Sequence, residues 1–302
     1  MRISEISRIC GYEFCGKDVD VDSIRFAECA KKTDIALLKS VNKIENTEAQ
    51  CVLISPALIN TDKTIIFACD SIEYAAVKIA KVLIEYGHGR NRSCSYQLNK
   101  NFYVGNDVIL GKNTFVGPNT YIENDVTIGD DCIISSNVFI GAGTVIHNGV
   151  KVGSGSSIGT DSFFHYYTED GLQEFEGIGS VIIEDDVTIG CNTIIQKGTF
   201  SDTVIKSRSK IGNLIDIGHD ANIGHDCKIV SQTGIASSVI IGDYVTIYGQ
   251  VGISNGVHIG DRAIVYGKSL VAKNIRENQA VSGMYARNHI DELRLQAKLR
   301  KL

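Results

Sequence analysis

Residues 104–158 read VGNDVI LGKNTF VGPNTY IENDVT IGDDCI ISSNVF IGAGTV IHNGVK VGSGSS I, with an aliphatic residue at every sixth position. The same period returns from Ile183 to Ile195 and, after a slip of four residues, from Ile205 to Val271. A period of six matches neither the 3.6 residues per turn of a helix nor the alternation of a simple strand. It is typical of a chain that coils in short strands and turns a corner in each repeat, with the aliphatic side chain pointing inward.

The residues around each aliphatic position fit such a coil. Twenty-four of the twenty-five positions carry Val or Ile, which suit a buried, pleated surface and suit helices poorly. Gly follows the aliphatic residue thirteen times, and we expect these glycines to adopt the unusual dihedrals of a corner. Small or β-branched residues four positions further on, such as Thr114 and Val126, predict a narrow interior. Three hexapeptides per coil would close a triangular prism of about eight coils, although the period alone fixes neither the hand nor the triangle.

The period also divides the chain into three parts. Residues 1–97 do not follow it and predict a separate small α/β domain, with strands at 51–54 and 64–68 and a helix that begins after Asp70 and ends near Gly87. Residues 98–275 form the β-coil, from which residues 160–182 leave as a loop. Residues 276–302 contain a basic, amphipathic helix, which we expect to cap the open end of the coil.

Composition argues against several classes of protein. The chain has 302 residues, a net charge of −5 and a pI near 5.8, so it lacks the basic surface that nucleic acid requires. Its nine cysteines are odd in number and include no CxxC pair, which predicts buried free thiols in a reducing cytoplasm and no metal site. The sequence shows no apolar signal segment and no run long enough to span a membrane. We therefore expect a soluble cytoplasmic protein that is not an integral membrane protein.

The loop at 160–182 is rich in aromatic residues, among them Phe163, Phe164, His165 and Tyr166. A monomer rarely leaves such a patch bare, so the loop either covers a ligand or packs against a neighbouring subunit. We favour the intersubunit contact and keep substrate binding as the alternative.

Among the seven histidines, His219 is the candidate for chemistry because Asp216 and Asp220 flank it and either could fix its tautomer. His225 has the same phase, but consecutive hexapeptides lie on different walls, so a shared metal is not expected. As a general base, an imidazole could take a proton from an attacking amine or hydroxyl. Ser237 follows one coil later, and its backbone N–H could meet an oxyanion. The alternative is a solvated corner histidine.

Three segments resemble one family. They are DIAL at 34–37 with TEAQCVLI at 47–54, IGCNTIIQKG at 189–198 with DTVI at 202–205, and NL at 213–214 with IGHD at 217–220. Together they resemble the UDP-3-O-acylglucosamine N-acyltransferases of lipid A synthesis, within the left-handed β-helix hexapeptide acyltransferases. The second segment includes the same four-residue slip.

The resemblance implies a left-handed β-helix, a homotrimer with active sites between adjacent prisms, and an N-terminal domain that binds uridine. It assigns the general base to His219 and the acyl donor to an acyl carrier protein thioester, whereas related prism enzymes use acetyl-CoA. No permanently bound cofactor is implied.

The sequence departs from the family at four positions. The aromatic residues that sandwich uracil fall near Leu37 and Lys43, and the acid that supports the base falls on Gly212. A second histidine falls near Gly256, and the oxyanion glycine is Ser237. The aromatic loop also differs, so the chain resembles a divergent branch of the family.

We expect an N-acyltransferase that moves an acyl group from an acyl carrier protein or CoA thioester to the amine of a nucleotide-linked amino sugar. The alternatives are an acetyl-CoA-dependent N-acetyltransferase for surface polysaccharide and a non-catalytic hexapeptide scaffold. The residues assigned to these steps are His219, Asp216, Asp220 and Ser237 for catalysis, Ser237, Gly249, Asn255 and Lys273 for donor binding, and Phe163, Phe164, His165, Tyr166 and Asn213 for substrate binding.

Overall fold

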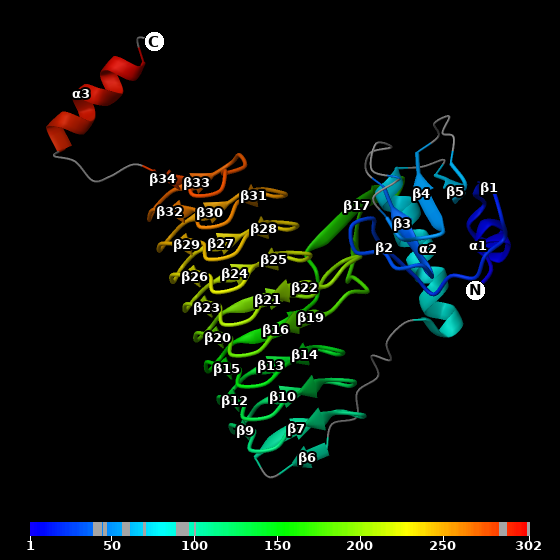
Figure 1. Ribbon diagram of the computed structural model, residues 1–302, viewed down its shortest axis with the longest axis horizontal. Coiled ribbons are helices and arrows are strands. Elements are labelled where there is room, and N and C mark those ends of the chain that lie inside the picture. Colours follow the sequence, from blue (N-terminus) through cyan, green and yellow to red (C-terminus); the bar gives the residue numbers. More distant parts are fainter. Residues whose placement is uncertain are drawn as a thin grey trace.

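The computed structural model describes residues 1–38, 44, 47–55, 61–68, 71–88, 97–99, 101–283 and 289–300. A long coil of short strands forms most of the molecule, a smaller N-terminal unit lies beside it, and the chain ends in a helix (Figure 1).

Three sheets form the walls of the coil, and their strands pair in parallel except at the start of sheet 1, where Gln97–Asn99 pairs antiparallel with Phe102–Val104. Sheet 1 contains β6 (Gln97–Asn99), β7 (Phe102–Val104), β10 (Tyr121–Ile122), β13 (Phe139–Ile140), β16 (Ser157–Thr160), β21 (Ile194–Gln196), β24 (Asp216–Ile217), β27 (Gly234–Ile235), β30 (Gly252–Ile253) and β33 (Leu270–Val271). Sheet 2 contains β8 (Ile109–Leu110), β11 (Thr127–Ile128), β14 (Val145–Ile146), β19 (Val181–Ile183), β22 (Thr203–Ile205), β25 (Asn222–Ile223), β28 (Ile240–Ile241) and β31 (His258–Ile259). Sheet 3 contains β9 (Phe115–Val116), β12 (Ile133–Ile134), β15 (Lys151–Val152), β20 (Thr188–Ile189), β23 (Lys210–Ile211), β26 (Lys228–Ile229), β29 (Thr246–Ile247), β32 (Ile264–Val265) and β34 (Ala280–Val281).

Each strand of a regular coil pairs with the strand 18 residues later, as Ile122 does with Ile140 and Ile217 does with Ile235. Three hexapeptides therefore make one coil. The fold is the triangular prism that the period suggests and the left-handed parallel β-helix that the resemblance implies.

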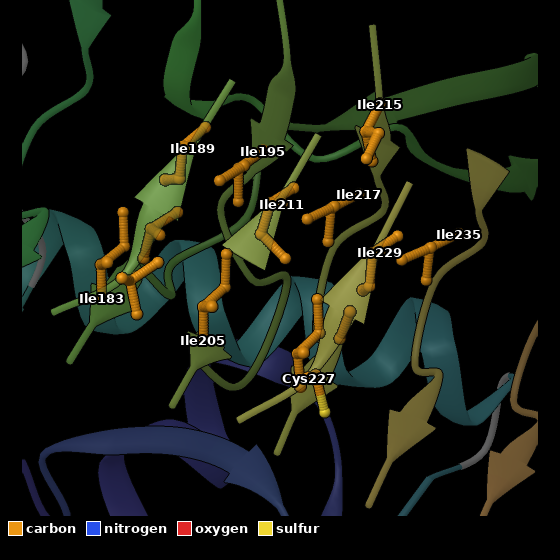
Figure 2. Close-up of a cluster of buried hydrophobic side chains, with 14 of the residues drawn as sticks. Ile183, Ile189, Ile195, Ile205, Ile211, Ile215, Ile217, Cys227, Ile229 and Ile235 are labelled. Atoms are coloured by element: carbon orange, nitrogen blue, oxygen red, sulfur yellow. The ribbon is translucent and has the colours of Figure 1, made fainter. Parts of the chain in front are cut away.

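The periodic aliphatic side chains fill the inside of the coil, as Figure 2 shows for Ile183 to Ile235. From Ile122 to Val271 all of them are buried, whereas Val104, Leu110 and Val116 in the first coil are half-buried because no coil lies below them. Each fully buried side chain contributes roughly 1.5–3 kcal/mol, and the contributions add along one continuous column.

The glycines after the aliphatic residues have a different cause from the one expected. A Cβ atom on Gly111 would lie 2.3 Å from the backbone of Gly129 in the next coil, so these positions are small because two coils approach closely. The positive φ of each corner falls two residues later, at Asn113 (φ 56°) and even at Leu214 (φ 55°). The predicted unusual dihedral at the first corner position is thus wrong, and Gly159 (φ +77°) is an exception.

The N-terminal unit is a five-stranded sheet in the order β1 (Glu13–Cys15), β5 (Thr64–Phe67), β4 (Cys51–Ile54), β3 (Asp34–Leu37) and β2 (Ser23–Phe26). It is parallel except for the β1–β5 pair. The helices are α1 (Ile3–Cys10) and α2 (Ile72–Leu83), and α2 continues into the π-helical turn η2 (Ile84–His88). The two predicted strands and the helix after residue 70 are confirmed. The hydroxyl of Ser71 caps α2 by accepting the N–H of Tyr74, and Asp70 lies outside the described residues.

The aromatic loop forms an antiparallel hairpin of β17 (Phe164–Thr168) and β18 (Gly171–Phe175). It reaches from the coil to the N-terminal unit (Figure 1), where Tyr166 and Phe175 are buried in the same cluster as α2. These two side chains are thus buried by their own chain, and the contact of the loop with a neighbouring subunit stays a prediction. Phe163 and Tyr167 remain exposed.

The C-terminal helix α3 (His289–Leu299) is present, as predicted. It does not cap the coil, because it projects away from the last strands (Figure 1) and leaves Ile290 and Leu293 about half exposed, at 53% and 50%. Within the described ranges, every helix is too short or too polar to cross a membrane.

The described cysteines only partly match the expected buried thiols. Cys10, Cys51, Cys132 and Cys227 are buried and free. The prediction is wrong for Cys15, Cys29 and Cys191, which are free but exposed.

Candidate active site

The chain passes from sheet 1 to sheet 2 at what we term the first edge of the prism, from sheet 2 to sheet 3 at the second edge, and from sheet 3 to sheet 1 at the third edge. Both irregularities of the period leave the coil at the first edge. Ile158 pairs with Ile195, 37 residues later, because the hairpin follows β16, and Ile195 pairs with Ile217, 22 residues later, because residues 197–202 follow β21. We call residues 197–202 the slip loop. The next corner of this edge carries His219 and Asp220.

The slip loop holds the carboxylate of Asp220. Its Oδ1 atom accepts the backbone N–H groups of Thr199 (3.0 Å), Phe200 (3.3 Å) and Ser201 (3.0 Å). The N–H of Asp220 donates to Thr203 Oγ1 at 2.9 Å. With 2% of its side chain exposed, Asp220 is fixed by charge-assisted hydrogen bonds away from water.

The imidazole of His219 lies against this carboxylate. Its Nδ1 atom is 2.7 Å from Asp220 Oδ2 and 3.0 Å from Thr199 Oγ1, and 11% of the side chain is exposed. A carboxylate only accepts, so in the neutral imidazole Nδ1 carries the proton and Nε2 has the free lone pair. Phe164 of the hairpin lies edge-on, with its ring centroid 6.0 Å away. This geometry suits a general base and does not fit the alternative of a solvated corner histidine.

Asp216 does not share this role, although the sequence allowed either acid. It lies on β24 and accepts a hydrogen bond from the side chain of Gln196 on β21. Partial desolvation raises the pKa of Asp216, although the Gln196 hydrogen bond opposes the shift. The acid that orients His219 is therefore Asp220.

Three predicted donor residues lie above His219 on the first edge. The parallel pairing of β24, β27, β30 and β33 puts Ser237, Asn255 and Lys273 at the same corner position in successive coils. Ser237 Oγ donates to Asn255 Oδ1 at 2.7 Å. Among the described residues, the Ser237 N–H makes no hydrogen bond to the chain, and its contact with an oxyanion stays a prediction.

The fourth donor residue, Gly249, and the predicted substrate residue Asn213 lie elsewhere. Both follow strands of sheet 3 and occupy the third edge. Asn213 Oδ1 accepts the N–H of Cys191 at 2.8 Å, which is a structural bond between coils. One chain alone therefore does not bring these two residues to His219.

The predicted aromatic contacts are also divided. Phe164 is the member whose ring approaches His219. Tyr166 is buried and its hydroxyl lies 3.1 Å from Lys81 Nζ on α2, whereas Phe163 is 76% exposed and packs edge-on against His165 at 4.5 Å.

Sequence reasoning missed Thr199 and Phe200, although the slip that contains them was visible as a break in the period. It also missed a cleft of about 1060 Å³ between the hairpin, the N-terminal unit and the first edge of earlier coils. Three cations line its wall. Arg25 pairs with Asp202 at 3.2 Å and Lys197 with Asp161 at 2.5 Å, whereas Lys81 Nζ lies 3.1 Å from the hydroxyl of Tyr166. Across the described positions, no group of three His, Cys, Asp or Glu residues could hold a metal ion.

Family models match the coil. The model described as bacterial transferase hexapeptide (six repeats) matches residues 107–142, and the hexapeptide repeat of succinyl-transferase matches residues 133–161.

Solved structures share the fold. A UDP-N-acetylglucosamine acyltransferase from Bacteroides fragilis superimposes with a TM-score of 0.56 at 24% identity, over 66% of this chain and 78% of its own. The enzyme of the same name from Francisella novicida gives a TM-score of 0.57 at 24% identity, over 66% and 73%.

Curated relatives match over nearly the whole chain. The UDP-3-O-acylglucosamine N-acyltransferase of Campylobacter lari is 33% identical over 99% of this chain and 97% of its own length, and that of Campylobacter jejuni is 34% identical over 99% and 97%. With the hexapeptide coil and the slip loop in place, this similarity shows that the chain belongs to the family of UDP-3-O-acylglucosamine N-acyltransferases.

Proposed function

We propose that the protein transfers an acyl group from a thioester to the amine of a nucleotide-linked amino sugar, with His219 as the general base. The observation that carries this proposal is the Nδ1 to Asp220 Oδ2 distance of 2.7 Å, which leaves Nε2 able to accept a proton.

In the proposed reaction, the amine nitrogen attacks the thioester carbonyl while His219 Nε2 removes its proton. The carbonyl oxygen becomes an oxyanion, which the N–H of Ser237 stabilises. The C–S bond then breaks, the amide C–N bond remains, and the leaving thiolate takes the proton from His219. No metal or bound cofactor takes part in these steps.

The acceptor is proposed from the names of the relatives, which act on a UDP-linked acylglucosamine. The N-terminal unit is the proposed site for the nucleotide. At one of the two positions where the family stacks uracil, this chain has Leu37, which is 2% exposed and gives no stacking platform. Lys43, the other position, lies outside the described residues. This difference favours the second candidate, an acetyl-CoA-dependent N-acetyltransferase that acts on a nucleotide-linked amino sugar for surface polysaccharide.

The donor and the assembly are part of the proposal. We propose a cytoplasmic homotrimer, in which a neighbouring prism could bring Gly249 and Asn213 to the first edge of its partner. An acyl carrier protein or CoA thioester would lie along Ser237, Asn255 and Lys273. The basic residues of α3, among them Arg294 and Lys298, suit an acidic carrier protein.

The test is the rate of His219→Ala with each donor. We expect a loss of about 10²- to 10⁴-fold in kcat, because a general base contributes this much. More than about a tenth of the wild-type rate in the variant would contradict the assignment. A panel that compares acetyl-CoA with long acyl carrier protein thioesters then separates the two candidate functions.

A further inference from the structure

The slip loop is anchored in the core of the N-terminal unit, far from the coil interior. Phe200 is the largest side chain among the fully buried residues of the described chain, and it belongs to the same cluster as α1 and α2. Its ring lies 5.9 Å from Phe26 of β2, 5.7 Å from Phe164 of β17 and 5.6 Å from Phe175 of β18, measured between centroids.

A second anchor lies two residues further on. Asp202 Oδ2 is 3.2 Å from Arg25 NH1 on β2, and its Oδ1 accepts the N–H and hydroxyl of Ser180 at 2.9 and 3.0 Å. The loop is thus tied to the N-terminal unit by an apolar side chain and by an ion pair, while its backbone faces Asp220.

Regular corners of the coil need no such anchor. At the second edge, Asp243 Oδ1 accepts one N–H, from His225 in the coil before it, at 2.8 Å. Asp220 Oδ1 instead accepts three consecutive N–H groups of an inserted segment. The orientation of the Asp220 carboxylate therefore depends on where the slip loop lies, and an inserted loop without buried contacts would move readily.

We propose that the slip loop couples the N-terminal unit to the general base, with Phe200 and Asp202 as positioning residues. The anchored loop holds Asp220, and Asp220 holds His219 in the tautomer with the proton on Nδ1. This inference rests on the proposed function, because it assumes that His219 is the base. The groups that face the imidazole are Asp220, the hydroxyl of Thr199 and the ring of Phe164, so Asp220 is its charged neighbour among the described residues.

The test compares Phe200→Ala with Phe175→Ala in the full chain. Both remove a buried phenyl ring from one cluster, but only Phe200 lies on the slip loop, whose amides bind Asp220. We expect Phe200→Ala to lower kcat by about 10- to 100-fold with little change in acceptor KM, because a small displacement of a catalytic group costs this much. Nitrogen-15 NMR of labelled histidine should show His219 losing its single Nδ1–H tautomer. Phe175→Ala removes one of the three rings that contact Phe200 and leaves the other two, so it should lower kcat much less and keep the tautomer. Phe200→Leu should recover most of the loss.

A second pair of variants applies if Phe200→Ala does not fold. Arg25→Gln removes the ion-pair anchor without opening a core cavity, and Arg208→Gln removes a surface pair with Asp226 on the second edge. We expect a lower kcat and a mixed tautomer only for Arg25→Gln.

Two different outcomes show whether the proposed function or only the positioning role is wrong. An active His219→Ala enzyme would overturn the proposed function. If His219→Ala is inactive, two results would overturn the positioning role alone. One is an unchanged kcat and tautomer in Phe200→Ala and Arg25→Gln, and the other is an equal loss of kcat in Phe200→Ala and Phe175→Ala.

Discussion

The first and third edges of the prism are built from the same hexapeptides but differ in what their corners hold. At the third edge, Cys191 N–H donates to Asn213 Oδ1 and Asn213 N–H donates to Ser231 Oγ, at 2.8 and 3.0 Å, so polar side chains link each coil to the next. Tyr248 and Tyr266, one position earlier in their hexapeptides, stack with ring centroids 5.5 Å apart at the same edge. No insertion interrupts it within the described coils.

At the first edge two insertions break the ladder, and a histidine and an aspartate are buried where the other edges carry half-buried or exposed polar residues. The aliphatic interior is the same beneath both edges. The comparison teaches that the coil supplies stability evenly, whereas chemistry is added at one edge by breaking its regularity.

The largest expected difference between the first edge and a regular edge comes from substituting the acid at a corner of each. Asp220→Asn keeps the shape but replaces the acceptor that fixes the His219 tautomer, so we expect kcat to fall by roughly 10²- to 10⁴-fold. Asp243→Asn, at a regular corner, should leave kcat near wild type. Steady-state rates for both variants, at a temperature where each is folded, are the measurement. Similar rates for the two variants would mean that the first edge is not special.

A second prediction uses matched glycines. A Cβ atom would lie 2.7 Å from Ser237 N at Gly218 on the first edge, and 2.7 Å from Ser231 N at Gly212 on the third edge. We expect Gly218→Ala and Gly212→Ala each to lower the free energy of unfolding by about 1–3 kcal/mol, because overpacking separates the two coils. Only Gly218→Ala should also lower kcat, since it moves Ser237 relative to His219. Urea unfolding and rates of the folded variants would check both parts, and a stable Gly212→Ala would argue against close approach as the reason for these glycines.

The smallest expected effect is the pH dependence of stability that comes from cysteine thiols buried in the coil and in the N-terminal unit. Burial raises the pKa of Cys227 in the coil to about 11 and that of Cys51 in the N-terminal unit to about 12, from 9.0. A raised folded-state pKa gives stability that is complete below pH 9 and is lost as the pH rises towards 11 and 12. For Cys227 the loss is roughly 2 kcal/mol at pH 10.5.

Urea midpoints at pH 8 and 10.5 test this expectation. The midpoint of Cys227→Ala should fall less with pH than that of the wild type. The exposed Cys191→Ala is the control, and its fall should match the wild type. An equal fall in all three proteins would show that buried thiols do not control the alkaline transition.

Much of the coil could be predicted because its physics is local and repeated. The aliphatic period depends on neighbouring hexapeptides, so Ile122 to Val271 lie inside as expected. The site was predicted in part for the same reason. Counting 18 residues from His219 leads to Ser237, Asn255 and Lys273 on one edge, and the same count excludes Gly249 and Asn213.

The remaining features depend on contacts between distant parts of the chain. The ring of Phe200 contacts those of Phe26 and Phe164, and no local pattern in the sequence predicts these contacts. Asp220, and not Asp216, orients His219 because three amides of the slip loop hold its carboxylate. In the sequence this loop was visible only as a four-residue break in the period of six. A glycine at a corner can be required by the close approach of two coils or by a positive φ. The sequence alone does not distinguish these two causes.

The pairing of Ile158 with Ile195 has a practical meaning for protein engineering. Strands in this coil recognise one another by layer and not by distance along the chain, so 37 residues of separation satisfy the same register as 18. A foreign segment grafted between β16 and β19 would therefore leave the stacking of the layers intact. At this edge, evolution or a designer can change the segment that contacts a ligand while the fold of the coil stays the same.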